Sequence, residues 1–138
     1  MTAVGLEELV ARLEHPDRLE RVHAAAALVC RGREDGAAVR ALVGALRGGN
    51  PLVRRLAALA LGDLGPCAGE AVPALAEALR DPDEGVCRLA VTALGLMGPA
   101  ARAAVPALWA ALRQEGDGLR DLVAAALRQI EPGGAAAA

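Results

Sequence analysis

The sequence repeats itself with a period of 33 residues, and this periodicity constrains the fold more than any other feature. The clearest copy, EAVPALAEALRDPDEGVCRLAVTALGLMGP, occupies residues 70–99. Moved back by 33 positions, Val86 and Leu94 of this copy coincide with Val53 and Leu61. A fixed period of this length is typical of stacked repeats, in which each copy buries its apolar face against the next. The sequence therefore predicts a solenoid.

Composition and spacing predict that the repeated unit is helical. Hydrophobic residues make up 54% of the chain and aromatic residues only 1%, so the core must consist of alanine, leucine and valine. Alanine and leucine are among the strongest helix formers. In the first copy, Leu6, Leu9, Val10 and Leu13 follow the spacing of one helical face. We therefore expect an all-α fold.

Four copies of the unit fit into residues 1–132, which we predict to be a single domain. The turn sequences HPD at 15–17, GGN at 48–50 and DPDE at 81–84 divide the first three copies into two helices each. In the third copy, the helices are predicted near 69–80 and 84–97. The copies are predicted at 3–32, 37–66, 70–99 and 103–132, and a low-complexity tail follows at 133–138.

The outer copies differ from the inner ones in ways that predict caps. Glu20 stands where later copies have valine or leucine, and Arg128 and Glu131 replace recurring glycines. Those glycines are Gly62 and Gly95 in one series and Gly65 and Gly98 in the other. Because glycine is unfavourable inside a helix, its recurrence predicts a close approach by the backbone of the next repeat. Charged residues are tolerated where no repeat follows.

The chain offers few groups for catalysis. It contains no serine, lysine or tyrosine, and all fifteen basic residues are arginine, a bias that GC-rich bacterial coding explains. His23 and Cys30 share a helix face, but no third metal ligand lies nearby. We predict no catalytic residue, no cofactor and no metal site. Cys30 and Cys87 are expected to be buried and Cys67 to be exposed.

Charge and hydropathy favour a cytoplasmic protein. The formal net charge of −2 argues against a nucleic-acid surface, which depends on clustered basic groups. The first ten residues carry acidic rather than basic side chains, and no apolar run approaches the ~20 residues of a membrane span. Neither a nucleic acid nor a membrane is therefore predicted as a partner.

The ordered set AVPALAEALR at 71–80 and DPDEGVCRLAVTALGLMG at 81–98 resembles the HEAT repeat, in the short form found in phycobilisome lyases and many bacterial adaptors. The resemblance implies an α-solenoid of four stacked antiparallel helix pairs, a right-handed superhelix whose second helices line the concave side. It also implies a ladder of turn acids and arginines. The acid positions hold Asp17, Asn50, Asp83 and Gly116, and the arginine positions hold Arg21, Arg54, Cys87 and Arg120. Only the first copy then has both members, and we assign these arginines a structural rather than a catalytic role.

The resemblance also implies where a partner would bind, because the variable positions of the second helices face the concave surface. Among them Leu56, Leu89 and Leu122 lie one period apart as an apolar row. Alternatively, these three leucines pack into the core of their own repeats. The residues predicted to bind a partner are Leu52, Arg55, Leu56, Leu59, Asp63, Arg88, Leu89, Thr92, Leu96, Asp121 and Leu122.

The predicted function is that of a non-catalytic scaffold or adaptor that binds an apolar or amphipathic protein segment on this concave face. Two alternatives remain open at this point: a subunit of a HEAT-like lyase, and a building block that self-associates into a homo-oligomer. Trp109, the only aromatic residue, lies on the apolar face of a first helix. We expect it to pack in the core or at the end of the solenoid, with an exposed binding hot spot as the alternative.

Overall fold

A computed structural model describes residues 4–114 and 117–132 of the chain. Within these ranges the chain forms only helices and turns, in agreement with the all-α prediction. Gly116 and the tail at 133–138, both named in the predictions above, lie outside the described residues. The elements are α1 (Leu6–Arg12), α2 (Arg18–Gly32), α3 (Gly36–Gly48), α4 (Pro51–Leu64), the 3₁₀-helix η1 (Gly65–Ala71), α5 (Val72–Ala78), α6 (Glu84–Met97), the 3₁₀-helix η2 (Gly98–Ala104), α7 (Val105–Gln114) and α8 (Asp117–Ile130).

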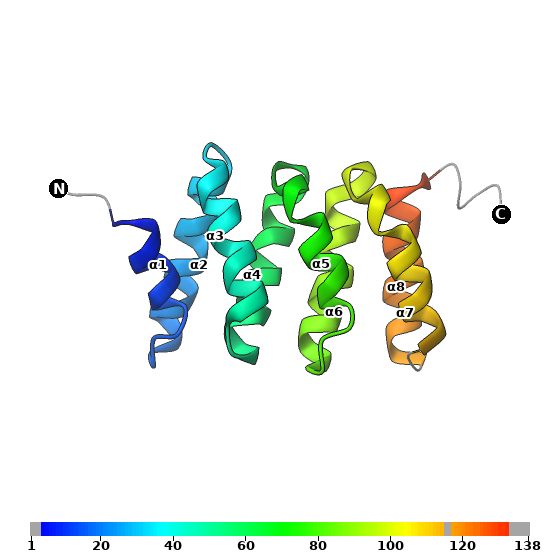
Figure 1. Cartoon of the computed structure of the whole chain (residues 1–138), viewed down its shortest axis with the longest axis horizontal. Coiled ribbons are helices and arrows are strands. Elements are labelled where there is room, and N and C mark those ends of the chain that lie inside the picture. Colours follow the sequence, from blue (N-terminus) through cyan, green and yellow to red (C-terminus); the bar gives the residue numbers. More distant parts are fainter. Residues whose placement is uncertain (1–3, 115–116, 133–138) are drawn as a thin grey trace.

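The helices form four pairs that stand side by side in chain order, from α1 and α2 at one end to α7 and α8 at the other (Figure 1). The first helices of the pairs, α1, α3, α5 and α7, form one layer, and the second helices, α2, α4, α6 and α8, form the layer behind it. The α-solenoid of four helix pairs is thus confirmed. We call the outer surfaces of these layers the first-helix face and the second-helix face.

Side chains at the predicted turns start the second helices. Asp17, Asn50 and Asp83 each accept a hydrogen bond from a backbone N–H in the first turn of α2, α4 and α6. Such caps satisfy donors that have no partner inside the helix. Pro51 occupies the first turn of α4, where a missing N–H costs little. The turn sequences therefore fix where α2, α4 and α6 begin.

The first helix of the third pair begins later than predicted. Helix α5 starts at Val72, and the preceding residues form η1 instead of extending the helix back to residue 69. The chain reverses at Gly65, whose φ of 57° is a left-handed value that favours glycine. Pro66 follows directly, so a tight 3₁₀ connection leads into α5.

Alanine, leucine and valine fill the interior, as the composition requires. The largest fully buried side chains include Leu28, Leu61, Leu94 and Ile130, one from each second helix. No polar or charged residue is buried among the described residues. The core is therefore a continuous apolar seam between the two layers and between neighbouring pairs, as expected for a stacked repeat.

The predicted close approach between second helices is confirmed for Gly62 and Gly95. A Cβ atom on Gly62 would lie 3.2 Å from the Cα atom of Ala93 in α6, and one on Gly95 would lie 3.1 Å from Ala126 Cα in α8. Both distances are shorter than ordinary van der Waals contact, so a side chain here would push neighbouring helices apart.

The other glycine series has a different cause from the predicted one. A Cβ atom on Gly98 would meet only ordinary contacts, the nearest being the Gln129 carbonyl oxygen at 3.8 Å. Its φ of 61°, like that of Gly65, is instead what requires glycine. These residues turn the chain after α4 and α6, and the next repeat does not crowd them.

Candidate partner-binding face

Three large apolar residues of the predicted site lie exposed on the second-helix face. Leu52 and Leu59 of α4 are 43% and 48% exposed, and Leu96 of α6 is 49% exposed. Singly scattered apolar residues are common on protein surfaces, but neighbouring ones mark interaction sites more often. Helices α4 and α6 pack directly on each other, so these leucines lie on two adjoining helices of the same face.

The predicted row of leucines, one from each of α4, α6 and α8, lies partly in the core and partly at the surface. Leu56, Leu89 and Leu122 are each partly buried and pack against the hydrophobic core. Part of each side chain therefore stabilises its own repeat, and the remainder is available at the surface. The core interpretation of this row therefore holds in part, and partner binding by the exposed remainder stays a prediction.

An apolar hollow of about 430 Å³ lies between α2 and α4 on this face. It brings together Leu56, Leu59 and Asp63 of the predicted site. Its other wall comes from α2, where Val22 is 47% exposed. Val22 is one period before Arg55 and thus occupies the equivalent position of its own repeat. This equivalence was the sequence signal that could have added Val22 to the predicted site. The lining residues are Val22, Ala25, Ala26, Val29, Cys30, Arg33, Leu56, Leu59, Ala60 and Asp63.

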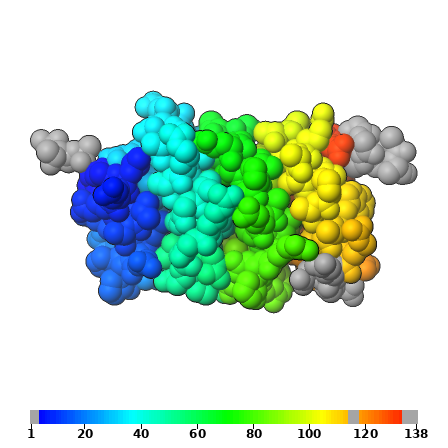
Figure 2. Space-filling view, in the orientation of Figure 1, coloured from blue at the N-terminus to red at the C-terminus, as the bar shows by residue number. Residues whose placement is uncertain are grey.

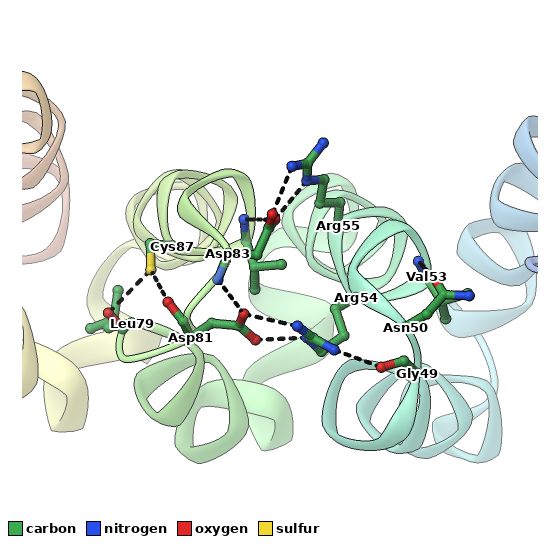
Figure 3. A network of polar contacts seen from close by, with 10 residues as sticks. Gly49, Asn50, Val53, Arg54, Arg55, Leu79, Asp81, Asp83 and Cys87 are labelled. Atoms are coloured by element: carbon green, nitrogen blue, oxygen red, sulfur yellow. Dashed lines mark hydrogen bonds and ion pairs between the residues drawn. The ribbon is translucent and has the colours of Figure 1, made fainter.

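Arg55 contacts the following repeat instead of standing free on the face. Its Nε and Nη2 donate hydrogen bonds of 2.7 Å each to the two carboxylate oxygens of Asp83, the N-cap of α6 (Figure 3). The hydrogen bond from Arg55 lowers the pKa of Asp83, and the same bond raises the pKa of Arg55. Both groups therefore stay charged at neutral pH and join α4 to α6.

Arg54 forms a second, more buried bridge to the same turn. Its Nε and Nη2 donate to Asp81 at 2.7 and 3.0 Å, and its Nη1 donates to the Gly49 carbonyl (Figure 3). The side chains of Arg54 and Asp81 are only 18% and 10% exposed. The hydrogen bond to Asp81 raises the pKa of Arg54. This bidentate pair joins α4 to the turn before α6.

These bridges correct the predicted ladder. The prediction paired each arginine with an acid of its own repeat and therefore found a complete rung only in the first copy. In that copy, Arg21 instead donates to the His15 and Pro16 carbonyls. The acid that pairs with Arg54 lies 27 residues further on, in the next repeat. The side chain of Arg54 points towards the next repeat. The sequence signal for this pair was therefore the separation of 27 residues between Arg54 and Asp81, which places the two in neighbouring repeats.

The remaining polar residues of the predicted site divide into paired and solvated groups. Arg88 donates to Glu84 one helical turn earlier, with Nη2 at 3.0 Å from Oε1. The Thr92 hydroxyl donates to the Arg88 carbonyl at 3.0 Å. Asp63 and Asp121 are exposed, and neither forms a hydrogen bond or ion pair within residues 4–114 and 117–132. These two carboxylates are the charges of the predicted site that remain available to a partner.

Comparison with known proteins identifies the repeat. The model of the family described as HEAT repeats matches residues 6–70 and again residues 66–128. The chain belongs to the HEAT-repeat family. Each helix pair is therefore one HEAT repeat, numbered 1 to 4 from α1/α2 to α7/α8. Comparison with curated protein sequences finds none that matches this chain.

Solved structures of similar fold include one with substantial sequence similarity. The complex of CpcE and CpcF of phycocyanin lyase from Nostoc sp. PCC7120 is 31% identical, with a TM-score of 0.67 over 96% of this chain. This chain spans 55% of the length of that structure's chain. An engineered protein is 23% identical with a TM-score of 0.64, covering 93% of this chain and 63% of its own, and shows the fold alone.

A further similar structure comes from work on a phosphorylation switch that controls the interaction between cadherin and beta-catenin. It is 27% identical with a TM-score of 0.61, and the match covers 92% of this chain and 29% of that chain.

The cysteines of the HEAT repeats follow the prediction in two cases out of three. Cys67 is exposed and Cys87 is buried, as expected, and the Cys87 thiol lies 3.0 Å from the Asp81 carbonyl oxygen. Cys30 is exposed, which corrects the prediction that it is buried. It faces the hollow between α2 and α4 and does not enter the core. Within the described part of the chain, no three His, Cys, Asp or Glu residues are grouped to hold a metal.

Trp109 does not pack in the core: its exposure on the last helix pair agrees with the alternative expectation of an exposed residue, whose binding role stays a prediction. It is 48% exposed on α7. Ala76, one period earlier, lines a hollow between α5 and α7, so this position points towards the following repeat. No further helix pair follows HEAT repeat 4 within the described residues, and Trp109 is left uncovered there.

Among the described residues, one helical stretch, residues 84–113, is long and apolar enough to cross a membrane by length and composition alone. It comprises three consecutive elements, α6, η2 and α7, and the chain turns at Gly98 between them. Leu94 and Leu108 from this stretch are fully buried in the solenoid core. The apolar character of the stretch is thus explained by packing between HEAT repeats.

Proposed function

We propose that this chain is a non-catalytic HEAT-repeat scaffold that binds a segment of a partner protein across its second-helix face. The observation that carries the proposal is the exposure of Leu52, Leu59 and Leu96 on α4 and α6. The surrounding helices are otherwise well packed, so these side chains contribute little to the fold. Exposed neighbouring apolar residues of this kind mark protein interaction sites.

The hollow between α2 and α4 supplies a place for an anchor side chain of the partner. Its apolar walls include Val22, Leu56 and Leu59, and Asp63 stands at its edge. An anchor that fills an apolar hollow supplies much of the binding energy of an interface. Asp63 and Asp121 then favour basic residues in the flanking parts of the partner.

The comparisons support a role in protein binding. One similar structure is a complex of two proteins, CpcE and CpcF, and another concerns the interaction between cadherin and beta-catenin. Repeat scaffolds keep their fold and vary their exposed face, so the partner of this chain is a property of its own surface. The absence of serine, lysine and tyrosine supports a non-catalytic role. A cytoplasmic location is part of the same proposal.

The test is selection of binding peptides from a display library of random sequences, using the full chain as bait. We expect selected peptides to share apolar anchors with flanking basic residues. Binding is then measured by fluorescence anisotropy with the Leu59→Glu and Leu96→Glu variants. Each variant is expected to weaken binding by about tenfold or more, because a buried unpaired carboxylate is costly at an interface. The thermal midpoint should change little, since both residues are exposed.

The matched control is Trp109→Glu, which changes an equally exposed apolar residue away from the second-helix face. Unchanged affinity in this variant supports the assignment. Equal loss of affinity in all three variants would reject the second-helix face as the binding site. A large drop in thermal midpoint for Leu59→Glu would show instead that this residue supports the fold.

A second candidate function is that of a lyase subunit, which the 31% identity to the CpcE–CpcF complex favours. The purified protein would then carry pigment and absorb visible light. A colourless preparation from cells that contain phycocyanin argues against this candidate. Self-association is a third possibility, and light scattering during size exclusion at high micromolar concentration distinguishes it from the leading proposal.

A further inference from the structure

A second apolar groove lies on the opposite side of the molecule, between α1 and α3 on the first-helix face. Figure 2 views this face, with the dark-blue α1 beside the cyan α3. The groove encloses about 540 Å³, a size typical of ligand and anchor pockets. Its apolar floor includes Leu6, Val10 and the buried Ala45 and Val53. The lining residues are Leu6, Glu7, Val10, Ala11, Glu14, Ala41, Gly44, Ala45, Gly48, Gly49 and Val53.

The equivalent groove one repeat later, between α3 and α5, has a different chemistry. It is about as large, at 510 Å³, but ion pairs form its walls. Arg47 of α3 pairs with Glu77 of α5 at 3.1 Å, and Arg54 pairs with Asp81. All four charges are therefore satisfied within the protein, and this groove offers a partner little to bind.

The period of 33 residues shows what has changed in the α1–α3 groove. Glu14 stands at the position of Arg47, and Gly44 stands at the position of Glu77. The arginine has been replaced by an acid and its partner by a residue without a side chain. The ion pair that spans the α3–α5 groove is therefore missing, and the apolar floor is left uncovered.

The fold gives no reason for Gly44. It lies inside α3, where glycine costs ~1 kcal/mol relative to alanine. A Cβ atom placed on it would meet no other atom within 4 Å, and its φ is not positive. In contrast to Gly62 and Gly98, neither close packing nor backbone conformation requires glycine here. Its effect is to keep the groove open.

Two carboxylates stand at the edge of the groove without a basic partner. Glu7 and Glu14 are both exposed. Among the described residues Glu7 forms no ion pair, and Glu14 receives only a long hydrogen bond of 3.5 Å from the Asn50 amide. The nearby Arg12 is already paired with Glu8. The groove therefore combines an apolar floor with uncompensated negative charge.

We propose that the α1–α3 groove binds a segment of a partner protein that inserts an apolar side chain and places an arginine or lysine against Glu7 and Glu14. Charge complementarity selects this occupant, because a basic group next to the anchor satisfies the carboxylates that the fold leaves unpaired. The site is separate from the second-helix face and lies on the other layer of the solenoid.

The experiment uses two short synthetic helical peptides with the same leucine positions, flanked by arginine in one and by glutamate in the other. Binding to the full chain is measured by fluorescence anisotropy at low and at physiological salt. We expect the arginine peptide to bind about tenfold more tightly than the glutamate peptide. Its affinity should fall as salt rises, because exposed charges are screened.

The decisive variant is the double substitution Glu14→Arg and Gly44→Glu, which reproduces the Arg47–Glu77 pair in the α1–α3 groove. It is expected to fold with an equal or higher thermal midpoint, since the added glutamate favours the helix over glycine. Binding of the arginine peptide should fall by about tenfold or more. This comparison is made in the Leu59→Glu background, with and without the double substitution, so that binding to the second-helix face is weakened in both proteins and the loss measured belongs to the α1–α3 groove.

Three outcomes would overturn the proposal. The first is equal binding of the two peptides, or no binding of the arginine peptide at millimolar concentration. The second is binding that Leu59→Glu removes and the double variant leaves intact, which assigns the peptide to the second-helix face. The third is self-association of the wild type, seen by sedimentation at high concentration, that the double variant abolishes. That result would assign the groove to a second copy of the chain.

Discussion

The grooves on either side of α3 share a backbone arrangement and differ in what their side chains do. Between α3 and α5, Arg47 and Arg54 reach across to acids of the next repeat. Between α1 and α3, glycines stand at the positions that correspond to Glu77 and Asp81, and Glu14 stands at the position of Arg47. The same period thus positions one groove whose charges bind the stack together and another whose charges remain free.

This difference teaches that a repeat has two separable sets of positions. One set, which includes Leu61 and Gly62, packs against the neighbouring repeat and must keep its size. The other set, at the edges of the grooves, is free to form internal ion pairs or to leave a surface for a partner. Four predictions test this division, from the largest expected effect to the smallest.

The largest effect is expected for Gly62→Val, at a position of close packing. A Cβ atom there already falls 3.2 Å from Ala93, so the two methyl groups of valine force α4 and α6 apart. We expect the free energy of unfolding to fall by about 2–3 kcal/mol, measured by urea denaturation with circular dichroism. The control is Gly44→Val, at a position with open space. Similar losses in both variants would contradict the division.

The second substitution, Asp81→Ala, removes the acceptor of the more buried ion pair. Arg54 would keep only its bond to the Gly49 carbonyl, with its charge partly buried. We expect a loss of about 2 kcal/mol in unfolding free energy. Glu77→Ala, which breaks the exposed pair with Arg47, should cost about 0.5 kcal/mol or less. A larger loss of unfolding free energy for Glu77→Ala than for Asp81→Ala would show that the exposed pair stabilises the protein more than the partly buried one.

The third, Gly44→Ala, should stabilise the protein. Alanine has open space at this position and is favoured in a helix interior, so the unfolding free energy should rise by about 1 kcal/mol. Thermal and urea denaturation both measure the change. A loss of stability would mean that the fold itself requires this glycine. Gly44 would then no longer support the proposal that the α1–α3 groove binds a partner.

The smallest effect concerns pH and the Arg55–Asp83 pair. The hydrogen bond from Arg55 lowers the pKa of Asp83 in the folded protein relative to the unfolded chain. Its stabilising contribution is therefore complete above the unfolded value of about 3.9 and is lost as the pH falls through the folded value. The difference in thermal midpoint between wild type and Asp83→Asn should be constant from about pH 5 to 7 and shrink below about pH 4. A difference that persists at about pH 2 would show that the carboxylate charge is not its source.

Much of the fold and part of the candidate face were predictable from the sequence. The turns and the second helices followed from the period and the apolar spacing. The exposure of Leu52, Leu59 and Leu96 followed from the resemblance to the HEAT repeat. The predicted ladder failed because it paired residues within one copy, whereas Arg54 reaches the acid of the next. Cys30 was placed in the core, and Trp109 in the core or at the end of the solenoid, because both are apolar. The local sequence pattern does not show whether a neighbouring repeat covers a given side of a helix.

The sequence by itself determined the solenoid, because a period of 33 residues with helical spacing leaves no other way to bury the apolar face of each copy. It also determined where the second helices begin, since an acid or amide in the turn caps the next helix. Only the tertiary structure decided which charges are used internally and which remain free. That outcome depends on distances between side chains of different repeats, which a periodic sequence places in register but does not specify.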